Sequence, residues 1–108
     1  MTYGIEGNLN IVNLNGGTFT IDKEPAGTIF YVNASSQLTT INLPPVSSIP
    51  VGRHYIIKRN GGAYNVTMDP NSNETIDGSS TKSAGGTWDS WRIVSTGSEW
   101  ITTDYGAT

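Results

Sequence analysis

Residues 64–102, YNVTMDPNSNETIDGSSTKSAGGTWDSWRIVSTGSEWIT, decide the predicted fold. Apolar and polar side chains alternate over residues 64–68, which is the period-two pattern of a strand with one apolar face. The pair Asp77-Gly78 suits a turn, because glycine reaches positive φ without steric cost. No nucleophile with a base and no set of metal ligands stands out in this stretch. It therefore predicts a β-scaffold that presents loops, with short strands at 64–68, 74–76, 88–95 and 99–103.

The rest of the chain continues the same pattern of short strands, at a spacing of about ten residues. Residues 28–33, TIFYVN, are apolar on both faces, so this strand is expected between two layers or against another chain. Asn15-Gly16-Gly17 predicts a tight hairpin turn between the first two strands. The other strands are expected at 8–14, 18–22, 38–43 and 53–59. Together they predict an all-β, compact sandwich or jelly-roll-like antiparallel domain of about eight short strands.

Length and composition predict one domain over residues 1–108. Only 14% of the 108 residues are charged and 35% are hydrophobic, which argues against a helical bundle and against a charged disordered tail. A chain of this size buries a modest core, so association with further copies would stabilise it. Residues 1–7 contain two glycines and are expected to be a loose lead-in, suited to a junction with an upstream segment.

Charge and targeting signals exclude several classes of partner. The formal net charge is −3, and Lys58-Arg59, which is expected to be a solvated strand end, is the only basic pair. No nucleic-acid footprint or membrane-surface patch is therefore expected. The sequence has no cysteine, no signal peptide at its start and no apolar run near the ~20 residues that span a bilayer. A soluble protein without a cofactor or membrane insertion is the expectation.

A set of motifs over residues 28–101 resembles a known group of domains. In chain order these are TIFYVNAS, INLPP, a glycine before YIIKR, NVT with a following proline, ETIDG and WRIVSTGSEWI. Their order and spacing resemble the small distal head domains of phage and other viral tail or head fibres. The residues that match the signature turn and the closing hairpin are Glu74, Thr75, Ile76, Asp77, Gly78, Gly97 and Trp100.

This resemblance implies a parallel homotrimer at the virion surface, carried on an upstream fibre or capsid protein. It also implies a host-attachment role, in which loops bind a cell-surface glycan or protein, and no enzymatic activity. The loops beside the signature turn are polar and rich in small residues, so they are the candidate receptor contacts. The candidate residues are Asn71, Ser72, Asn73, Ser79, Ser80, Thr81, Lys82 and Trp88.

Other motifs have plainer interpretations. Asp69-x-Asn71-x-Asn73 imitates the start of an EF-hand loop, but the later ligand positions do not fit, so a local turn is favoured over a cation site. His54 lacks a nucleophile and an orienting acid, so it is expected at a strand edge or an interface. Trp91 and Trp100 are expected to pack in the core, whereas Trp88, which follows two glycines, is expected near the surface.

Two further function classes remain as alternatives. One is a purely structural trimerisation or capsid-decoration module without a receptor. The other is a glycan hydrolase that uses a carboxylate pair such as Asp22 with Glu24 or Glu74 with Asp77. The hydrolase is disfavoured because a domain this small rarely builds the groove in which two carboxyl groups flank a glycosidic bond.

Overall fold

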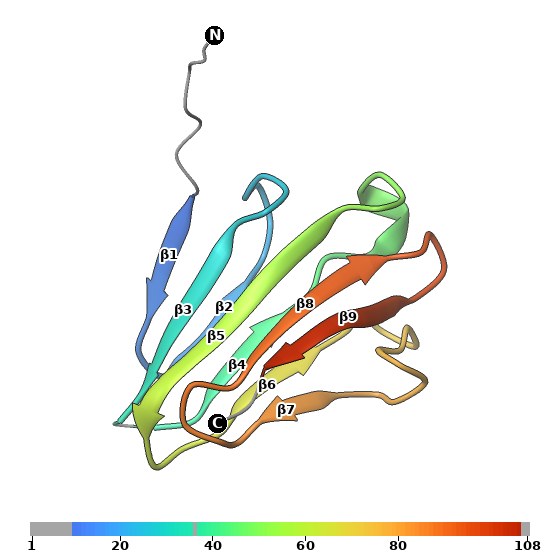
Figure 1. Ribbon diagram of the computed structural model, residues 1–108. Coiled ribbons are helices and arrows are strands. Elements are labelled where there is room, and N and C mark those ends of the chain that lie inside the picture. Colours follow the sequence, from blue (N-terminus) through green and yellow to red (C-terminus); the bar gives the residue numbers. More distant parts are fainter. Residues whose placement is uncertain (1–9, 36, 107–108) are drawn as a thin grey trace, which may run out of the picture.

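The computed structural model describes residues 10–35 and 37–106, and in this part of the chain nine strands form two sheets packed face to face (Figure 1). The prediction of an all-β fold is confirmed, while the predicted lead-in at residues 1–7 lies outside the described residues. No helix in the described part of the chain is long and apolar enough to cross a membrane. The elements are β1 (Ile11–Leu14), β2 (Gly17–Thr20), β3 (Ile29–Ala34), β4 (Thr39–Asn42), the 3-10 turn η1 (Val46–Ser48), β5 (His54–Gly62), β6 (Val66–Asp69), β7 (Lys82–Ala84), β8 (Ser90–Ser95) and β9 (Trp100–Gly106).

The sheets are mixed, which corrects the prediction of an antiparallel domain. The five-stranded sheet has the order β1-β3-β5-β8-β9 and the four-stranded sheet the order β2-β4-β6-β7. β1, β3 and β5 are parallel to one another, as are β2, β4 and β6. Only β7, β8 and β9 add in antiparallel fashion. The chain therefore stacks three β-arches, each with one strand in each sheet, and then closes the stack with antiparallel strands.

The Asn-Gly-Gly sequences form arches rather than hairpins, so the hairpin predicted at Asn15-Gly16-Gly17 is wrong. β1 and β2, which flank this turn, lie in different sheets. The second Asn-Gly-Gly sequence ends β5 at Gly62, and β6 begins only four residues later in the opposite sheet. Gly62 has a φ of 120°, and a Cβ there would lie 2.6 Å from the carbonyl group of Ala34. Glycine is required at this position because the arch crosses directly over the neighbouring strand.

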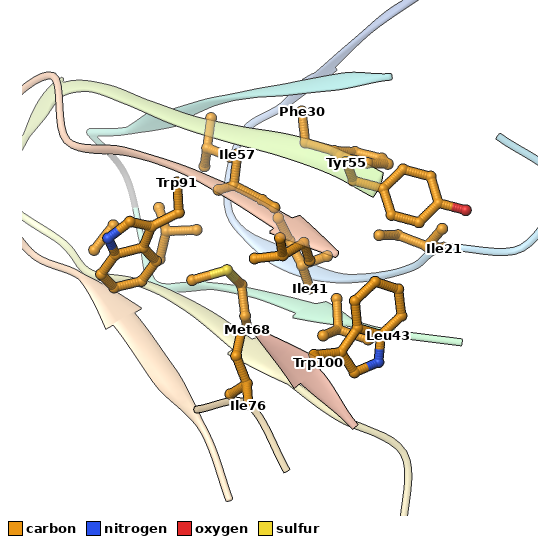
Figure 2. Close-up of a cluster of buried hydrophobic side chains, with 14 of the residues drawn as sticks. Ile21, Phe30, Ile41, Leu43, Tyr55, Ile57, Met68, Ile76, Trp91 and Trp100 are labelled. Atoms are coloured by element: carbon orange, nitrogen blue, oxygen red, sulfur yellow. The ribbon is translucent and has the colours of Figure 1, made fainter. Parts of the chain in front are cut away.

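The core lies between the sheets and follows the alternation of the strands (Figure 2). Phe30, Ile57 and Ile93 of the larger sheet and Ile41 and Met68 of the smaller sheet are all inaccessible to solvent. As the sequence predicts, Trp91 and Trp100 are buried and Trp88 is 43% exposed. Figure 2 shows Trp91 at one end of the core and Trp100 beside Leu43 at the other.

Arg59 is buried, which corrects the prediction that the Lys58-Arg59 pair is a solvated strand end. Its side chain is 2% exposed and points into the sandwich from β5. Nε donates to the carbonyl oxygen of Tyr64 at 2.9 Å, and Nη2 donates to that of Gly62 at 2.8 Å. Arg59 thus donates hydrogen bonds to two carbonyl groups of the arch between β5 and β6. Without these bonds, burial would remove water from both carbonyl groups and leave them without a partner.

The outward faces of the two sheets differ sharply in chemistry. Thr18, Thr40, Thr67 and Ser83 lie side by side across the four-stranded sheet. The matching row of the five-stranded sheet places Ile11, Ile29 and Ile56 side by side and continues to the exposed Arg92 on β8, and the next outward row places Val94 between His54 and Ile101. We call the five aliphatic residues of these rows, Ile11, Ile29, Ile56, Val94 and Ile101, the aliphatic face. His54 belongs to the same surface, on central strand β5, so of its two predicted locations the strand edge is wrong and the interface stays a prediction.

The signature turn fastens the end of the smaller sheet to β9. Trp100 N–H donates to the Thr75 carbonyl oxygen at 2.9 Å, and Asp77 N–H donates to that of Trp100 at 3.0 Å. The Asp77 carboxylate accepts from the Thr102 N–H at 2.9 Å and from the Thr102 hydroxyl at 2.6 Å, and it pairs with Lys82 at 3.0 Å. Ile76 is fully buried, and Gly78 and Gly97 have positive φ angles of 81° and 96°. Each signature residue in this region has a structural contact or a backbone constraint of its own.

These contacts predict a stability that depends on pH. Burial alone would raise the pKa of Asp77, but the hydrogen bonds from Thr102 and the charge and hydrogen bond of Lys82 lower it below the ordinary 3.8. A carboxyl group with a depressed pKa stabilises the fold above its unfolded pKa, and that contribution is lost as the pH falls through the folded pKa. We expect Asp77→Asn to lower the free energy of unfolding at neutral pH by ~1 kcal/mol and to flatten the loss of stability below about pH 4. Chemical denaturation at several pH values measures this, with Asp22→Asn, which removes an exposed charge, as the control. Equal acid sensitivity in both variants would contradict the assignment.

Candidate functional site

A hollow of about 700 Å³ lies where the parallel strands of the four-stranded sheet end. β2, β4 and β6 finish in register at Thr20, Asn42 and Asp69, so these three side chains lie next to one another along the outer face. The chain continues the ladder for one more residue, since Ile21 N–H donates to Asn42 and Leu43 N–H donates to Asp69 through backbone bonds of 3.0 Å. The volume falls within the ~300–1,000 Å³ that is usual for ligand pockets.

Polar groups make up the rim of the hollow. They are two carboxylates, two side-chain amides and three hydroxyls, from Asp22, Asp69, Asn42, Asn71, Thr20, Ser48 and Ser72. One contact within the rim is fixed, because the Asn42 amide nitrogen donates to the Thr20 hydroxyl at 3.2 Å. No lysine or arginine is among the lining residues. The rim therefore offers both donors and acceptors, and its formal charge is negative.

The floor of the hollow is apolar and rests on the core. It is formed by Ile21, Leu43, Pro44, Pro45 and Pro70. Ile21 and Leu43 are buried at 1% and 2% exposure. Figure 2 shows both of them beside Trp100 and Tyr55, whose rings lie 6.1 Å apart between centroids. The tightly packed end of the sandwich thus holds the floor in place.

The wall is set by Glu74 and by the turn that precedes it. The Glu74 carboxylate accepts from the Val46 N–H at 3.2 and 3.3 Å, which fixes the start of η1 beside the hollow. Ser48 at the end of η1 donates its hydroxyl to the Pro45 carbonyl oxygen at 2.7 Å. On the other side, the Glu74 N–H donates to the carbonyl oxygen of Asn71 at 2.9 Å. Ser72 adopts a φ of 54°, which is uncommon for a residue other than glycine. One signature residue therefore positions both sides of the hollow.

The structure separates the candidate receptor contacts into three places. Asn71 and Ser72 line the hollow, and Asn73 is exposed in the same turn. Ser79, Ser80 and Thr81 are exposed between the signature turn and β7, where Lys82 pairs with Asp77. These residues follow the β7–β9 side of the sandwich and do not line the hollow.

Trp88 lies at the opposite end of the molecule from the hollow. Its carbonyl oxygen accepts from Lys58 Nζ at 2.8 Å, and the same ammonium lies 5.7 Å from the centroid of its ring. Lys58 is in the C-terminal half of β5, close to the arch that leads into the start of β6, whereas Asn71 follows the end of β6. A single small ligand cannot contact Trp88 and Asn71 together.

Sequence reasoning missed most of the hollow. Thr20, Asn42 and Asp69 lie far apart in the chain and become neighbours only because β2, β4 and β6 are parallel. A signal was present in the sequence, since each of these strands ends in a polar residue that is followed by an apolar residue or a proline. In an antiparallel sheet this pattern would not bring the polar residues together, because the ends of successive strands lie at opposite edges.

Of the four carboxylates named in the hydrolase alternative, Asp22 lines the hollow and the other three bind groups of the fold, with Glu24 accepting from the Asp22 N–H at 2.9 Å. Glu74 binds the η1 backbone, and Asp77 binds Thr102 and Lys82. Within residues 10–35 and 37–106, no three acidic or histidine side chains gather in an arrangement that could hold a metal ion. Comparisons with known proteins add no assignment, because no protein-family model and no curated protein matches the sequence significantly.

Proposed function

We propose that this protein is a viral host-attachment module that binds a cell-surface glycan in the hollow at the ends of β2, β4 and β6. The observation that carries the proposal is the pairing of a polar rim with an apolar floor in one concave site. A sugar ring presents hydroxyl groups around its edge and C–H groups on its faces. Carboxylates and amides would bind the hydroxyls, and Pro45, the one floor residue that is partly exposed, would cover a C–H face.

The charge of the rim narrows the class of glycan. Asp22 and Asp69 line the hollow and no basic side chain does. A sialic acid, a uronic acid or a phosphorylated sugar would bring a further negative charge next to these carboxylates, which costs binding energy. Neutral hexoses and amino sugars are therefore the proposed ligands. Among the candidate receptor contacts, the proposal therefore selects Asn71 and Ser72 rather than residues 79–82 or Trp88.

We further propose that three copies assemble as a parallel homotrimer on an upstream fibre or capsid protein at the virion surface. The aliphatic face supports this, because it contrasts with the hydroxyl-rich face of the other sheet. Five strands spaced ~4.8 Å apart make a face ~24 Å wide, and three such faces around an axis enclose a space that side chains can fill. Three hollows on one rigid body would turn weak contacts into firm attachment.

Binding to immobilised glycans tests the proposal. We expect neutral glycans to bind and their sialylated forms to bind at least tenfold more weakly. The double variant Asp22→Ala/Asn71→Ala removes two rim groups that no backbone bond of the fold requires, and each lost hydrogen bond should weaken binding by about tenfold. The matched control is Ser80→Ala/Trp88→Ala, which changes the other candidate contacts and should bind within about twofold of the unmodified protein.

Three results would contradict the proposal. If the control variant loses binding and the rim variant retains it, the contact lies elsewhere on the molecule. If no glycan and no host cell binds although the protein is folded, a purely structural trimerisation or capsid-decoration role replaces the proposal. If the bound glycan is cleaved and the rim variant abolishes cleavage, the protein is an enzyme. In that case Asp22 and Asp69 become the carboxylates to examine.

A further inference from the structure

The rim of the hollow and the outer face of the four-stranded sheet share three side chains. Thr20, Asn42 and Asp69 line the hollow, and in register they also form the last outward row of β2, β4 and β6. The hollow is therefore one end of a longer surface, because this sheet face continues back along the strands (Figure 1). A ligand in the hollow lies next to the side chains that the preceding rows present.

The row next to the rim consists of hydroxyl groups. Side chains two residues apart in a strand lie on the same face, ~6.6 Å from each other. The residues at this level, which we call the hydroxyl row, are Thr18, Thr40, Thr67 and Ser83. The Thr67 and Ser83 hydroxyls bond to each other at 3.1 Å, whereas those of Thr18 and Thr40 bond to no other group in the described part of the chain. Two adjacent hydroxyls beside the rim can thus donate to and accept from a ligand.

An apolar side chain lies beyond the hydroxyl row on the same face. Leu38 is 60% exposed and Thr39 is buried, so Leu38 lies on the outer face, two residues before Thr40. At the other end, Pro45 is the partly exposed residue of the floor of the hollow. A strand rises ~3.3 Å per residue, so Leu38 and Pro45 are up to ~23 Å apart. This distance is several times the length of one sugar ring.

The chemistry of this surface separates a glycan from other ligands. Neither the hydroxyl row nor the lining of the hollow contains a lysine or arginine, so an acidic polysaccharide or a nucleic acid has no cation to bind there. The hydroxyl row also lacks the aromatic, methionine and arginine side chains that are enriched in protein interfaces. Uncharged groups that both donate and accept hydrogen bonds suit the hydroxyls of neutral sugars.

We propose that the ligand is a linear neutral polysaccharide that is bound along its length rather than at a terminal sugar. The inference rests on the proposed glycan-binding function and deepens it. One sugar unit occupies the hollow, and the chain continues along β4 over the hydroxyl row to Leu38. The Thr18 and Thr40 hydroxyls bond to sugar hydroxyls, while Leu38 and Pro45 cover C–H faces at the two ends.

Titrations with linear oligosaccharides of one to six units, followed by NMR, test the inference. The probes are homo-oligomers of glucose, galactose, mannose and N-acetylglucosamine. In the series that binds, we expect the hexasaccharide to bind at least tenfold more tightly than the single sugar, because only the longer chain reaches the hydroxyl row and Leu38. Asn71→Ala in the hollow should weaken the binding of every length by the same factor.

A matched pair of variants isolates the hydroxyl row. Thr18→Val/Thr40→Val removes both hydroxyls and keeps the β-branched shape that suits a strand. It should bind the single sugar within about twofold of the unmodified protein and lose the gain with chain length. The control Thr18→Ser/Thr40→Ser keeps both hydroxyls and should keep the gain.

Two results would overturn the inference and leave the proposed function in place. Equal affinities for the single sugar and the hexasaccharide would make the hollow a site for a terminal sugar. A gain with chain length that persists in Thr18→Val/Thr40→Val would show that the chain leaves the hollow in another direction. If the unmodified protein binds neither single sugars nor longer chains in any of the four series, the proposed function is refuted, and the inference fails with it.

Discussion

Trp100→Ala is expected to remove a large part of the protein's free energy of unfolding. Trp100 is fully buried, packs against Tyr55 and belongs to the strand that the signature turn fastens. Truncating a buried tryptophan costs ~3–5 kcal/mol, because it removes apolar contacts and leaves a cavity. A domain of this size has a total stability of only ~5–15 kcal/mol. Urea denaturation followed by circular dichroism measures the loss.

The same substitution at Trp88 provides the control. Trp88 is 43% exposed and lies against Lys58 rather than in the core. We expect Trp88→Ala to change the free energy of unfolding by less than about 1 kcal/mol. Equal losses at the two positions would show that the packing at the Trp100 end of the core does not dominate stability. The account of how the floor of the hollow is held in place would then be wrong.

Ile56→Glu is expected to convert a trimer into single chains. Ile56 is in the middle of the aliphatic face, between Ile29 on β3 and Arg92 on β8. If three such faces meet around an axis, three added carboxylates would lose water close to one another, and this desolvation and mutual repulsion would oppose assembly. Light scattering at several concentrations should give a mass about three times the 11.5 kDa of one chain for the unmodified protein and 11.5 kDa for the variant.

Thr40→Glu is the matched control on the other sheet. Thr40 has the equivalent outward position on central strand β4, within the hydroxyl-rich face. It should leave the mass of the assembly unchanged, because that face is expected to remain in solvent. An unmodified protein that stays a single chain at every concentration would remove the support for the homotrimer. Dissociation by Thr40→Glu alone would move the interface to the four-stranded sheet.

The sequence predicts most of the strands and predicts their pairing poorly. The strand predicted at residues 74–76 is wrong, since only isolated bridges at Ile76 form there, and β7 was not predicted. The apolar alternation of residues 64–68 marks the side chains that face the core, and Val66 and Met68 are indeed fully buried. Alternation is a local property, so it cannot distinguish a hairpin partner from a strand in the opposite sheet. The turn at residues 15–17 illustrates this. Gly16 and Gly17 both have positive φ, and such a pair of glycines is compatible with an arch as well as with a hairpin.

The hollow could not be predicted for the same reason. Its rim depends on the parallel register of Thr20, Asn42 and Asp69, and only Asn71 and Ser72 could be selected from turn composition alone. The burial of Arg59 could not be predicted either, because arginine is rarely buried unless its N–H groups find acceptors. The carbonyl groups of Gly62 and Tyr64 supply those acceptors, and only the folded arch brings them within reach.

The most direct test of the central claim is a titration of the ¹⁵N-labelled protein with a neutral glycan, followed through the backbone amide signals. We predict that the signals of Asn42, Asn71 and Ser72 shift together and saturate with one dissociation constant, while those of Ser80 and Trp88 stay in place. Shifts confined to the Trp88 end or to residues 79–82, with the three signals of the hollow unmoved, would contradict the assignment of the hollow as the attachment site.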